Sequence, residues 1–410
     1  MKKLINNLLF DRWVLLFTVL VFFDMLIKHN LETHGVFFGY FVEVFLLILF
    51  NLKRCAPKLI VIKTQCYLLF FSALICFTMM FIFHLLAKEV ITDQIVYRYI
   101  DLVFLLYFTF FSKINKLEEI GFAIKIVTII GSLSVLFVSQ GDVLYDWRKD
   151  TDTLADKGYL TILFAISQCL CIADIIYKRN ISMNIILLMF FLYINMFFVQ
   201  SKTAFLSLAF NFIVMFALLR GRFRFYFIIG LLAFAIIIFF NSSFLLTDSI
   251  ANGINVFFGS EIFGLDAQTE KYSMVTFDMR DMITNYSLLL FLKSPLWGIG
   301  IGGYEASGGI LGVMECESTF LDMLVEGGLL YFMPILASII IPLVVGFYNA
   351  KIKKETSYQL FWVLSVIPCI IVCFYYNDFL FPFPFALIGI CSYVVFNKNE
   401  RYKTVPTIKY

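Results

Sequence analysis

Charged residues are scarce in this chain. Asp, Glu, Lys and Arg make up 15% of its 410 residues, whereas soluble domains carry about 25%. Hydrophobic residues make up 61%, and the mean hydropathy is +0.90. Because the apolar runs come in blocks of about 20 residues, the length that crosses ~30 Å of hydrocarbon, the composition excludes a water-soluble globular domain. It indicates an integral membrane protein.

Patterns typical of metal sites and disulfide frameworks are also lacking. The three histidines, His29, His34 and His84, show no metal-binding spacing. The nine cysteines are an odd number and form no disulfide framework. Cys169 and Cys171 form a C-x-C pair, but no second Cys or His pair stands nearby to complete a zinc site. We therefore predict no metal and no cofactor.

The alternation of apolar blocks and polar gaps predicts an all-α polytopic membrane protein with about twelve transmembrane helices. Short basic gaps alternate with long or acidic ones, which follows the positive-inside rule and places both termini in the cytoplasm. The whole chain, 1–410, is interpreted as one membrane domain, with a large periplasmic loop, 242–318, between the ninth and tenth spans. The predicted spans are roughly 11–28, 36–52, 66–86, 94–112, 121–140, 159–177, 183–199, 202–219, 224–241, 319–348, 358–376 and 380–397.

The large loop is expected to be functional, because long loops without function are uncommon. Within it, residues 273–293 predict a helix that ends before Pro295. Arg280, Thr284 and Ser287 share one stripe, which we expect to turn Arg280 towards the polar interior, at the outer membrane surface or in the bundle mouth. The opposite face is apolar and comprises Met279, Met282, Ile283, Tyr286, Leu289 and Leu290.

A glycine run, residues 298–303, contains a formal G-x-G-x-x-G. A dinucleotide site would need a strand before this run and a βαβ unit around it, and the sequence offers neither. We interpret the run as a flexible or tightly turning connection, with backbone N–H groups that could serve a ligand.

Two cations in the predicted outer region are candidate phosphate ligands. Lys202 opens a span behind Ser201 or Thr203 as cap, and a helix N-terminus with a lysine suits phosphate; the alternative is a lysine that snorkels at the membrane boundary. Arg280 could instead pair with a neighbouring aspartate on a surface helix. Together, Lys202 and Arg280 could hold a pyrophosphate.

Two acidic residues flank Cys316 just before the tenth span. Either Glu315 or Glu317 could act as general base for a sugar hydroxyl. The alternative is an acidic cap at a helix N-terminus, and Thr319 with Asp322 fits a capping box for that span.

The order of these segments resembles the bacterial O-antigen polymerase (Wzy-type) and O-antigen ligase superfamily. The matching segments are the Ser-Lys-Thr-Ala start at Ser201, Arg280 on the loop helix, the run 295–304, and the stretch from Glu317 through Glu326 to Leu329. The resemblance implies a GT-C-type glycosyltransferase of the bacterial inner membrane, with its active site facing the periplasm.

The resemblance also implies residue roles. Lys202 and Arg280 would bind the pyrophosphate of the donor, and Arg280 and Glu317 would be catalytic, with Glu317 near the acceptor hydroxyl. Secondary candidates are Arg148, Tyr304, Glu315 and Glu326. The implied partners are undecaprenyl-pyrophosphate-linked oligosaccharides as donor and acceptor, membrane lipids, and a chain-length regulator and flippase in the same membrane, but no nucleic acid.

We expect a polymerase that transfers the growing surface glycan to the next lipid-linked repeat. A ligase acting on lipid A core is the first alternative, although ligases of the superfamily are expected to carry a histidine near the tenth span and none follows His84 here. A flippase or transporter is the second. Transport would predict charged or Gly/Pro-broken helices near mid-membrane and an internal repeat, and the sequence shows neither.

Overall fold

A computed structural model describes part of the chain. It covers residues 74–75, 77–78, 93–110, 117–139, 157–177, 180–199, 201–218, 267–308, 316, 318–352, 357–376 and 382–396. In these ranges every regular element is a helix, which confirms the all-α class.

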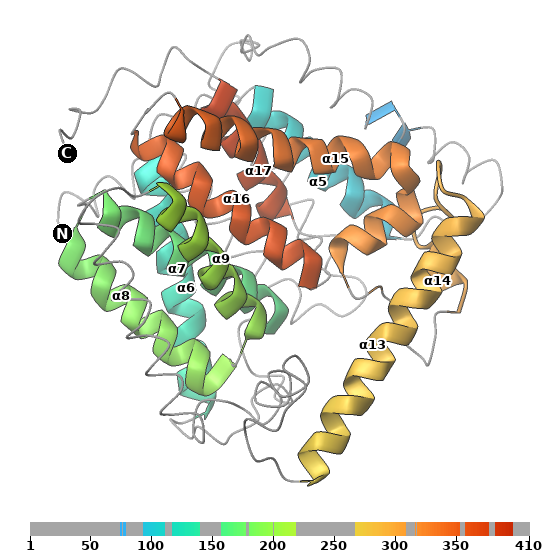
Figure 1. Cartoon of the computed structure of the whole chain (residues 1–410), viewed down its shortest axis with the longest axis horizontal. Coiled ribbons are helices and arrows are strands. Elements are labelled where there is room, and N and C mark those ends of the chain that lie inside the picture. Colours follow the sequence, from blue (N-terminus) through green and yellow to red (C-terminus); the bar gives the residue numbers. More distant parts are fainter. Residues whose placement is uncertain are drawn as a thin grey trace.

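The helix boundaries follow the predicted spans to within a few residues, because apolar runs and their polar ends are local features of the sequence. The elements are α5 (Asp93–Phe110), α6 (Leu117–Ser139), α7 (Lys157–Ile176), α8 (Ile181–Ile194), the π-helix η2 (Asn195–Val199), α9 (Lys202–Leu218), α13 (Ala267–Lys293), α14 (Gly303–Ala306), α15 (Thr319–Lys351), α16 (Tyr358–Tyr376) and α17 (Pro382–Phe396). Figure 1 shows their arrangement.

Four helices of the described part are long and apolar enough to cross a membrane, and they lie in α6, α7, α15 and α16. The shorter apolar helices are 181–194, 203–218 and 383–396. The total of about twelve spans stays a prediction. The spans expected at 11–28, 36–52 and 224–241 lie outside the described residues, and so does the span expected at 66–86 apart from residues 74–75 and 77–78.

The core is built around α7 and α16. In each of these helices 83% of the membrane-length window is buried, so both lie inside the bundle. α16 packs against α7, α9 and α15, and α17 packs against α5. One buried polar contact ties α6 to its neighbours: Lys125 Nζ lies 2.6 Å from both Asp174 Oδ2 of α7 and Asn184 Oδ1 of α8. A charged ammonium group buried in an apolar bundle is costly unless polar side chains pair with it.

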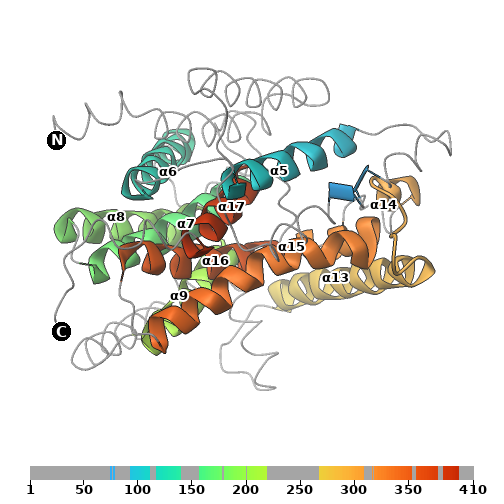
Figure 2. The same ribbon diagram turned by 90° about the horizontal axis from the view of Figure 1, so that it is seen from above.

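The beginnings of α5 and α15 lie at the same end of the bundle as the end of α16. Phe320 and Phe374 have ring centroids 5.7 Å apart, and Arg98 contacts Asp322. α15 and α16 are therefore antiparallel. Seen from above, α15 lies between α5 and α13 (Figure 2). The same-side placement of these ends matches the predicted alternation of spans, while the orientation in a membrane stays a prediction.

Candidate functional site

α15 is interrupted at Gly328, near its beginning. Gly328 has φ 63° and ψ −173°, a conformation that favours glycine. The rings of Phe320 and Phe332 lie 5.9 Å apart between centroids, although twelve residues of straight helix would separate their Cα atoms by about 18 Å. The chain therefore bends sharply at Gly328, and the two parts of α15 form a V in Figure 1.

We call residues 319–327 the short limb of α15 and residues 329–351 the long limb. The long limb is about 34 Å long and is sufficient to cross a membrane by itself. The short limb carries Asp322 and Glu326. α15 is thus a glycine-broken helix with charges beside the break. The sequence did not show this break, while the expectation that broken helices are absent near mid-membrane stays a prediction.

The segment 295–300 pairs with the backbone groups that the break exposes. Two of its N–H groups donate to the last carbonyl oxygens of the short limb, and two of its carbonyl oxygens accept from the first N–H groups of the long limb. The four bonds are Ile299 N to Val325 O (3.0 Å), Gly300 N to Glu326 O (3.0 Å), Leu329 N to Pro295 O (2.9 Å) and Leu330 N to Leu296 O (3.2 Å).

The glycines at this crossing allow two backbones to touch. A Cβ on Gly298 would lie 2.1 Å from Glu326 O, and one on Gly328 would lie 2.4 Å from Gly298 N. The glycine run is therefore a tight structural contact rather than a flexible connection. The N–H groups of Ile299 and Gly300 are used by α15, which corrects the interpretation that these groups could serve a ligand.

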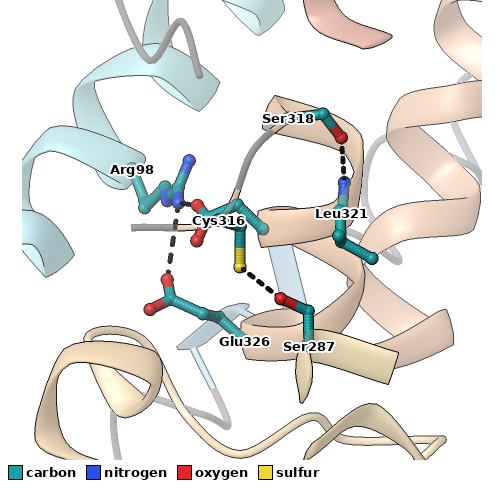
Figure 3. A network of polar contacts seen from close by, with 7 residues as sticks. Arg98, Ser287, Cys316, Ser318, Leu321 and Glu326 are labelled. Atoms are coloured by element: carbon teal, nitrogen blue, oxygen red, sulfur yellow. Dashed lines mark hydrogen bonds and ion pairs between the residues drawn. The ribbon is translucent and has the colours of Figure 1, made fainter. Parts of the chain in front are cut away.

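Arg98 joins α5 to the short limb. Its side chain is 3% exposed, and its Nη2 contacts Asp322 Oδ2 closely and lies 3.4 Å from Glu326 Oε2. The two carboxylates stand four residues apart and so share one face of the short limb. Figure 3 shows the guanidinium pointing towards the short limb and Glu326 pointing back towards it.

Two further polar side chains belong to this group. Asp101 lies one turn beyond Arg98 on α5 and is 0% exposed, and Tyr331 of the long limb is 1% exposed. The Tyr331 hydroxyl interacts electrostatically with Arg98, Asp101 and both carboxylates of the short limb. We call these five residues, Arg98, Asp101, Asp322, Glu326 and Tyr331, the acidic cluster.

The acidic cluster combines one guanidinium with three carboxyl groups and a phenol. Such groups can accept a proton from a hydroxyl and hold that hydroxyl by hydrogen bonds. Among the described residues, no group of three acidic, cysteine or histidine side chains is arranged to hold a metal ion. The chemistry that the cluster offers is proton transfer and hydroxyl recognition.

Ser318 caps the short limb. Leu321 N donates to Ser318 Oγ at 3.1 Å, which satisfies one of the free N–H groups at the helix start. Asp322 was expected to complete a capping box with Thr319, but its side chain is directed to Arg98 instead. The predicted capping box is wrong because a buried cation offers the carboxylate a stronger partner than a backbone amide.

Tyr304 lies in a small apolar cluster behind the short limb. It packs with Ile283 and Leu290 of α13 and with Val325 of the short limb, and it is 1% exposed. Ser287 Oγ donates to Cys316 Sγ at 3.6 Å in the same region (Figure 3). These contacts tie the end of the large loop to the limb that carries the acidic residues. Tyr304 supports this packing.

Arg280 lies on α13 with an exposed side chain. It therefore does not turn into the protein as expected. The predicted division of the α13 faces is also partly wrong, since Ser287 is buried with Ile283 and Leu290. Leu289 is 61% exposed. The reason is that this face packs on the short limb and leaves other apolar side chains outward.

Lys202 begins α9, as predicted. The turn before it is fixed by Asn195, whose Oδ1 accepts from Ser201 N at 3.0 Å. Ser201 Oγ accepts from Ala204 N at 3.2 Å, so Ser201 is the cap. The side chain of Lys202 lies outside the description, and its pairing with Arg280 on a pyrophosphate stays a prediction.

Three further candidates cannot be placed. Arg148, Glu315 and Glu317 lie outside the described residues. Glu326, a secondary candidate, is the one predicted acidic residue that lies in the acidic cluster.

No protein-family model matches the chain, and no curated protein sequence matches it.

Sequence reasoning missed four members of the acidic cluster. A signal was present for Arg98 and Asp101, since ionisable residues inside a membrane span are candidates for function and both stand within the predicted span 94–112. The sequence around Asp322 and Tyr331 gave less indication that these two residues belong to a functional site. Their proximity to Arg98 depends on the break at Gly328, which no local pattern shows.

Proposed function

We propose that the protein is a glycan polymerase of the inner membrane. It transfers the growing surface polysaccharide from undecaprenyl pyrophosphate to the next lipid-linked repeat unit. The observation that carries the proposal is the acidic cluster: a carboxylate, Glu326, held 3.4 Å from a buried arginine on a helix that follows directly on the large loop. This arrangement supplies the base that a glycosyl transfer to a hydroxyl requires.

The order of segments along the chain supports the same assignment. The Ser-Lys-Thr-Ala helix start, the loop helix with Arg280, the glycine run and the acidic stretch occur in the order of the O-antigen polymerase and ligase superfamily. The helical membrane fold agrees with that resemblance. In the proposal, the acidic cluster faces the periplasm.

The reaction needs one base and cations for the leaving group. The acceptor oxygen bonds to the anomeric carbon of the donor glycan while the bond from that carbon to the pyrophosphate oxygen breaks. The bonding electrons leave with undecaprenyl pyrophosphate, whose charge Lys202 and Arg280 stabilise. The hydroxyl proton passes to a carboxylate of the acidic cluster.

Glu326 is the better base of the two carboxylates on the short limb. Asp322 makes the closer contact with Arg98, while Glu326 lies at 3.4 Å from the same nitrogen. We therefore assign Asp322 to holding Arg98 in place and Glu326 to proton transfer. Glu317, the base expected from sequence, remains the competing assignment.

Transport is the second candidate, because the structure contains a feature that many transporters share. α15 is broken at a glycine and carries charges next to the break, as discontinuous helices of transporters do. A transporter for a lipid-linked oligosaccharide would move its substrate without forming a covalent product. Product formation therefore separates the two functions.

The test compares three glutamate variants in cells that depend on this protein for surface polysaccharide. We expect Glu326→Gln to reduce long-chain polymer by roughly 100-fold or more, the usual range for loss of a general base. Glu118→Gln, on an exposed side chain of α6, is the control and should leave polymer unchanged. Polymer is measured on gels, and the amount of inserted protein by immunoblot of membranes.

The variant Glu317→Gln decides between the two bases. Normal polymer from Glu326→Gln together with its loss from Glu317→Gln would move the base to Glu317. Normal polymer from both would remove catalysis by a glutamate from the proposal.

A further inference from the structure

Tyr331 is fixed on two sides of its ring. A Cβ on Gly327 would lie 2.3 Å from Tyr331 Cδ1, so the ring lies directly on the backbone of the short limb. The ring of Phe77 lies 5.5 Å away between centroids, and Phe77 in turn makes an edge contact with Tyr99 of α5 at 4.1 Å. The position of the phenol is therefore set by packing.

The hydroxyl of Tyr331 has no hydrogen-bond partner in the part of the chain that the structure describes, although the side chain is 1% exposed. Buried tyrosine hydroxyls usually find a partner. This hydroxyl lies instead within electrostatic range of Arg98, Asp322 and Glu326. A donor that is held rigidly beside such groups, and that has no partner among the described residues, is suited to a ligand.

The charges of the acidic cluster indicate which class of ligand the Tyr331 hydroxyl would bind. Among the described residues, the cluster brings together three carboxyl groups and one guanidinium, so acidic groups outnumber basic ones there. A pyrophosphate carries negative charge and is disfavoured next to carboxylates at short range in an apolar bundle. A sugar hydroxyl is neutral, donates to a carboxylate and accepts from a phenol.

We propose that Tyr331 and Glu326 form the acceptor subsite, in which the phenol donates to the oxygen of a sugar hydroxyl and the carboxylate accepts its proton. The pyrophosphate of the donor binds outside the acidic cluster. This assignment rests on the proposed polymerase function. It adds to that function the location of the site that binds the uncharged acceptor sugar.

The test is the variant Tyr331→Phe, with Tyr393→Phe as matched control. Tyr331 is 1% and Tyr393 2% exposed, but Tyr393 lies on α17 and outside the acidic cluster. Two probes are titrated against the purified full-length protein: the free repeat-unit oligosaccharide, and undecaprenyl pyrophosphate without sugar. We expect Tyr331→Phe to weaken oligosaccharide binding by about 10-fold and to leave undecaprenyl pyrophosphate binding unchanged, while Tyr393→Phe changes neither.

A stability measurement accompanies the titration. Because the Tyr331 hydroxyl lacks a partner among the described residues, its removal should not lower the melting temperature, so a binding loss cannot be attributed to unfolding. Equal oligosaccharide binding by Tyr331→Phe and the unsubstituted protein would overturn the subsite. Weakened undecaprenyl pyrophosphate binding would also overturn it, by placing the leaving group at the cluster.

The two proposals fail in different ways. If the unsubstituted protein binds the oligosaccharide in a Tyr331-dependent way but forms no polymer from lipid-linked repeats, the polymerase function fails and the sugar subsite stands. If polymer forms and its rate shows the same dependence on acceptor concentration in Tyr331→Phe, the subsite fails alone.

Discussion

Arg98 is the residue on which the acidic cluster depends most. Its guanidinium contacts both Asp322 and Glu326, and the side chains of all three are less than a tenth exposed. Buried carboxylates without a cation are costly, and removal of one partner from a buried pair destabilises by about 3–5 kcal/mol. The arginine also bridges two acceptors on one helix face, which a lysine cannot do with the same geometry.

We therefore predict that Arg98→Met lowers the melting temperature of the purified protein strongly. Arg98→Lys should retain most of the stability, because the charge remains, but should reduce polymer formation. Arg280→Met, on an exposed side chain, is the control for loss of an arginine and should change stability by less than about 0.5 kcal/mol. A melting temperature for Arg98→Met equal to that of Arg280→Met would contradict the buried pairing.

Residue identities alone predicted only part of this site. Glu326 was a candidate because it stands in a stretch of recognisable order, and Arg280 because it is a lone arginine on a helix. Arg98 was not recognised, since it is separated from Asp322 by 224 positions and from Glu326 by 228. Partners that far apart are set by packing between helices.

At the scale of elements, the segment 295–300 and the break in α15 form one unit. Each supplies the hydrogen-bond partners that the other lacks, and the contact leaves no room for a side chain at Gly298 or Gly328. The unit sets the direction of the short limb, and with it the position of Glu326. Disturbing the break should therefore affect both stability and activity.

The variant Gly328→Ala tests this unit, and Gly308→Ala is its control. Both glycines have positive φ, 63° and 84°, but a Cβ on Gly328 would meet the backbone at 2.4 Å, whereas nothing lies within 4 Å of one on Gly308. Both variants bear the backbone strain of a positive φ, and Gly328→Ala adds the clash. We expect a clearly lower melting temperature and loss of polymer for Gly328→Ala alone; matching melting temperatures would contradict the close contact.

Helix ends were predictable where they depend on nearby residues. α9 begins at Lys202, behind its Ser201 cap, and α13 ends at Lys293, just before Pro295. The break in α15 was not predictable, because a glycine inside an apolar run is compatible with a straight helix. It is the contact with Gly298, thirty positions earlier, that makes Gly328 a bend.

At the scale of the whole molecule, composition predicted the class and packing created the site. Apolar blocks indicated a helical membrane protein, and the described helices confirm that class. The position of α15 between α5 and α13 (Figure 2) follows from contacts between residues far apart in the sequence, such as Arg98 with Asp322. A bundle whose charged residues meet beside a broken helix is suited either to catalysis or to transport. The polymerase proposal requires that it catalyse glycosyl transfer.

The most direct test is incubation of the purified full-length protein with lipid-linked repeat units and nothing else. The proposal predicts a ladder of polymer and released undecaprenyl pyrophosphate from the unsubstituted protein. No ladder should form with Arg280→Ala, in spite of normal stability, because the leaving group is then unsupported. Product that forms only after lipid A core is added would identify a ligase instead, and the absence of any covalent change would contradict the enzymatic function and favour transport.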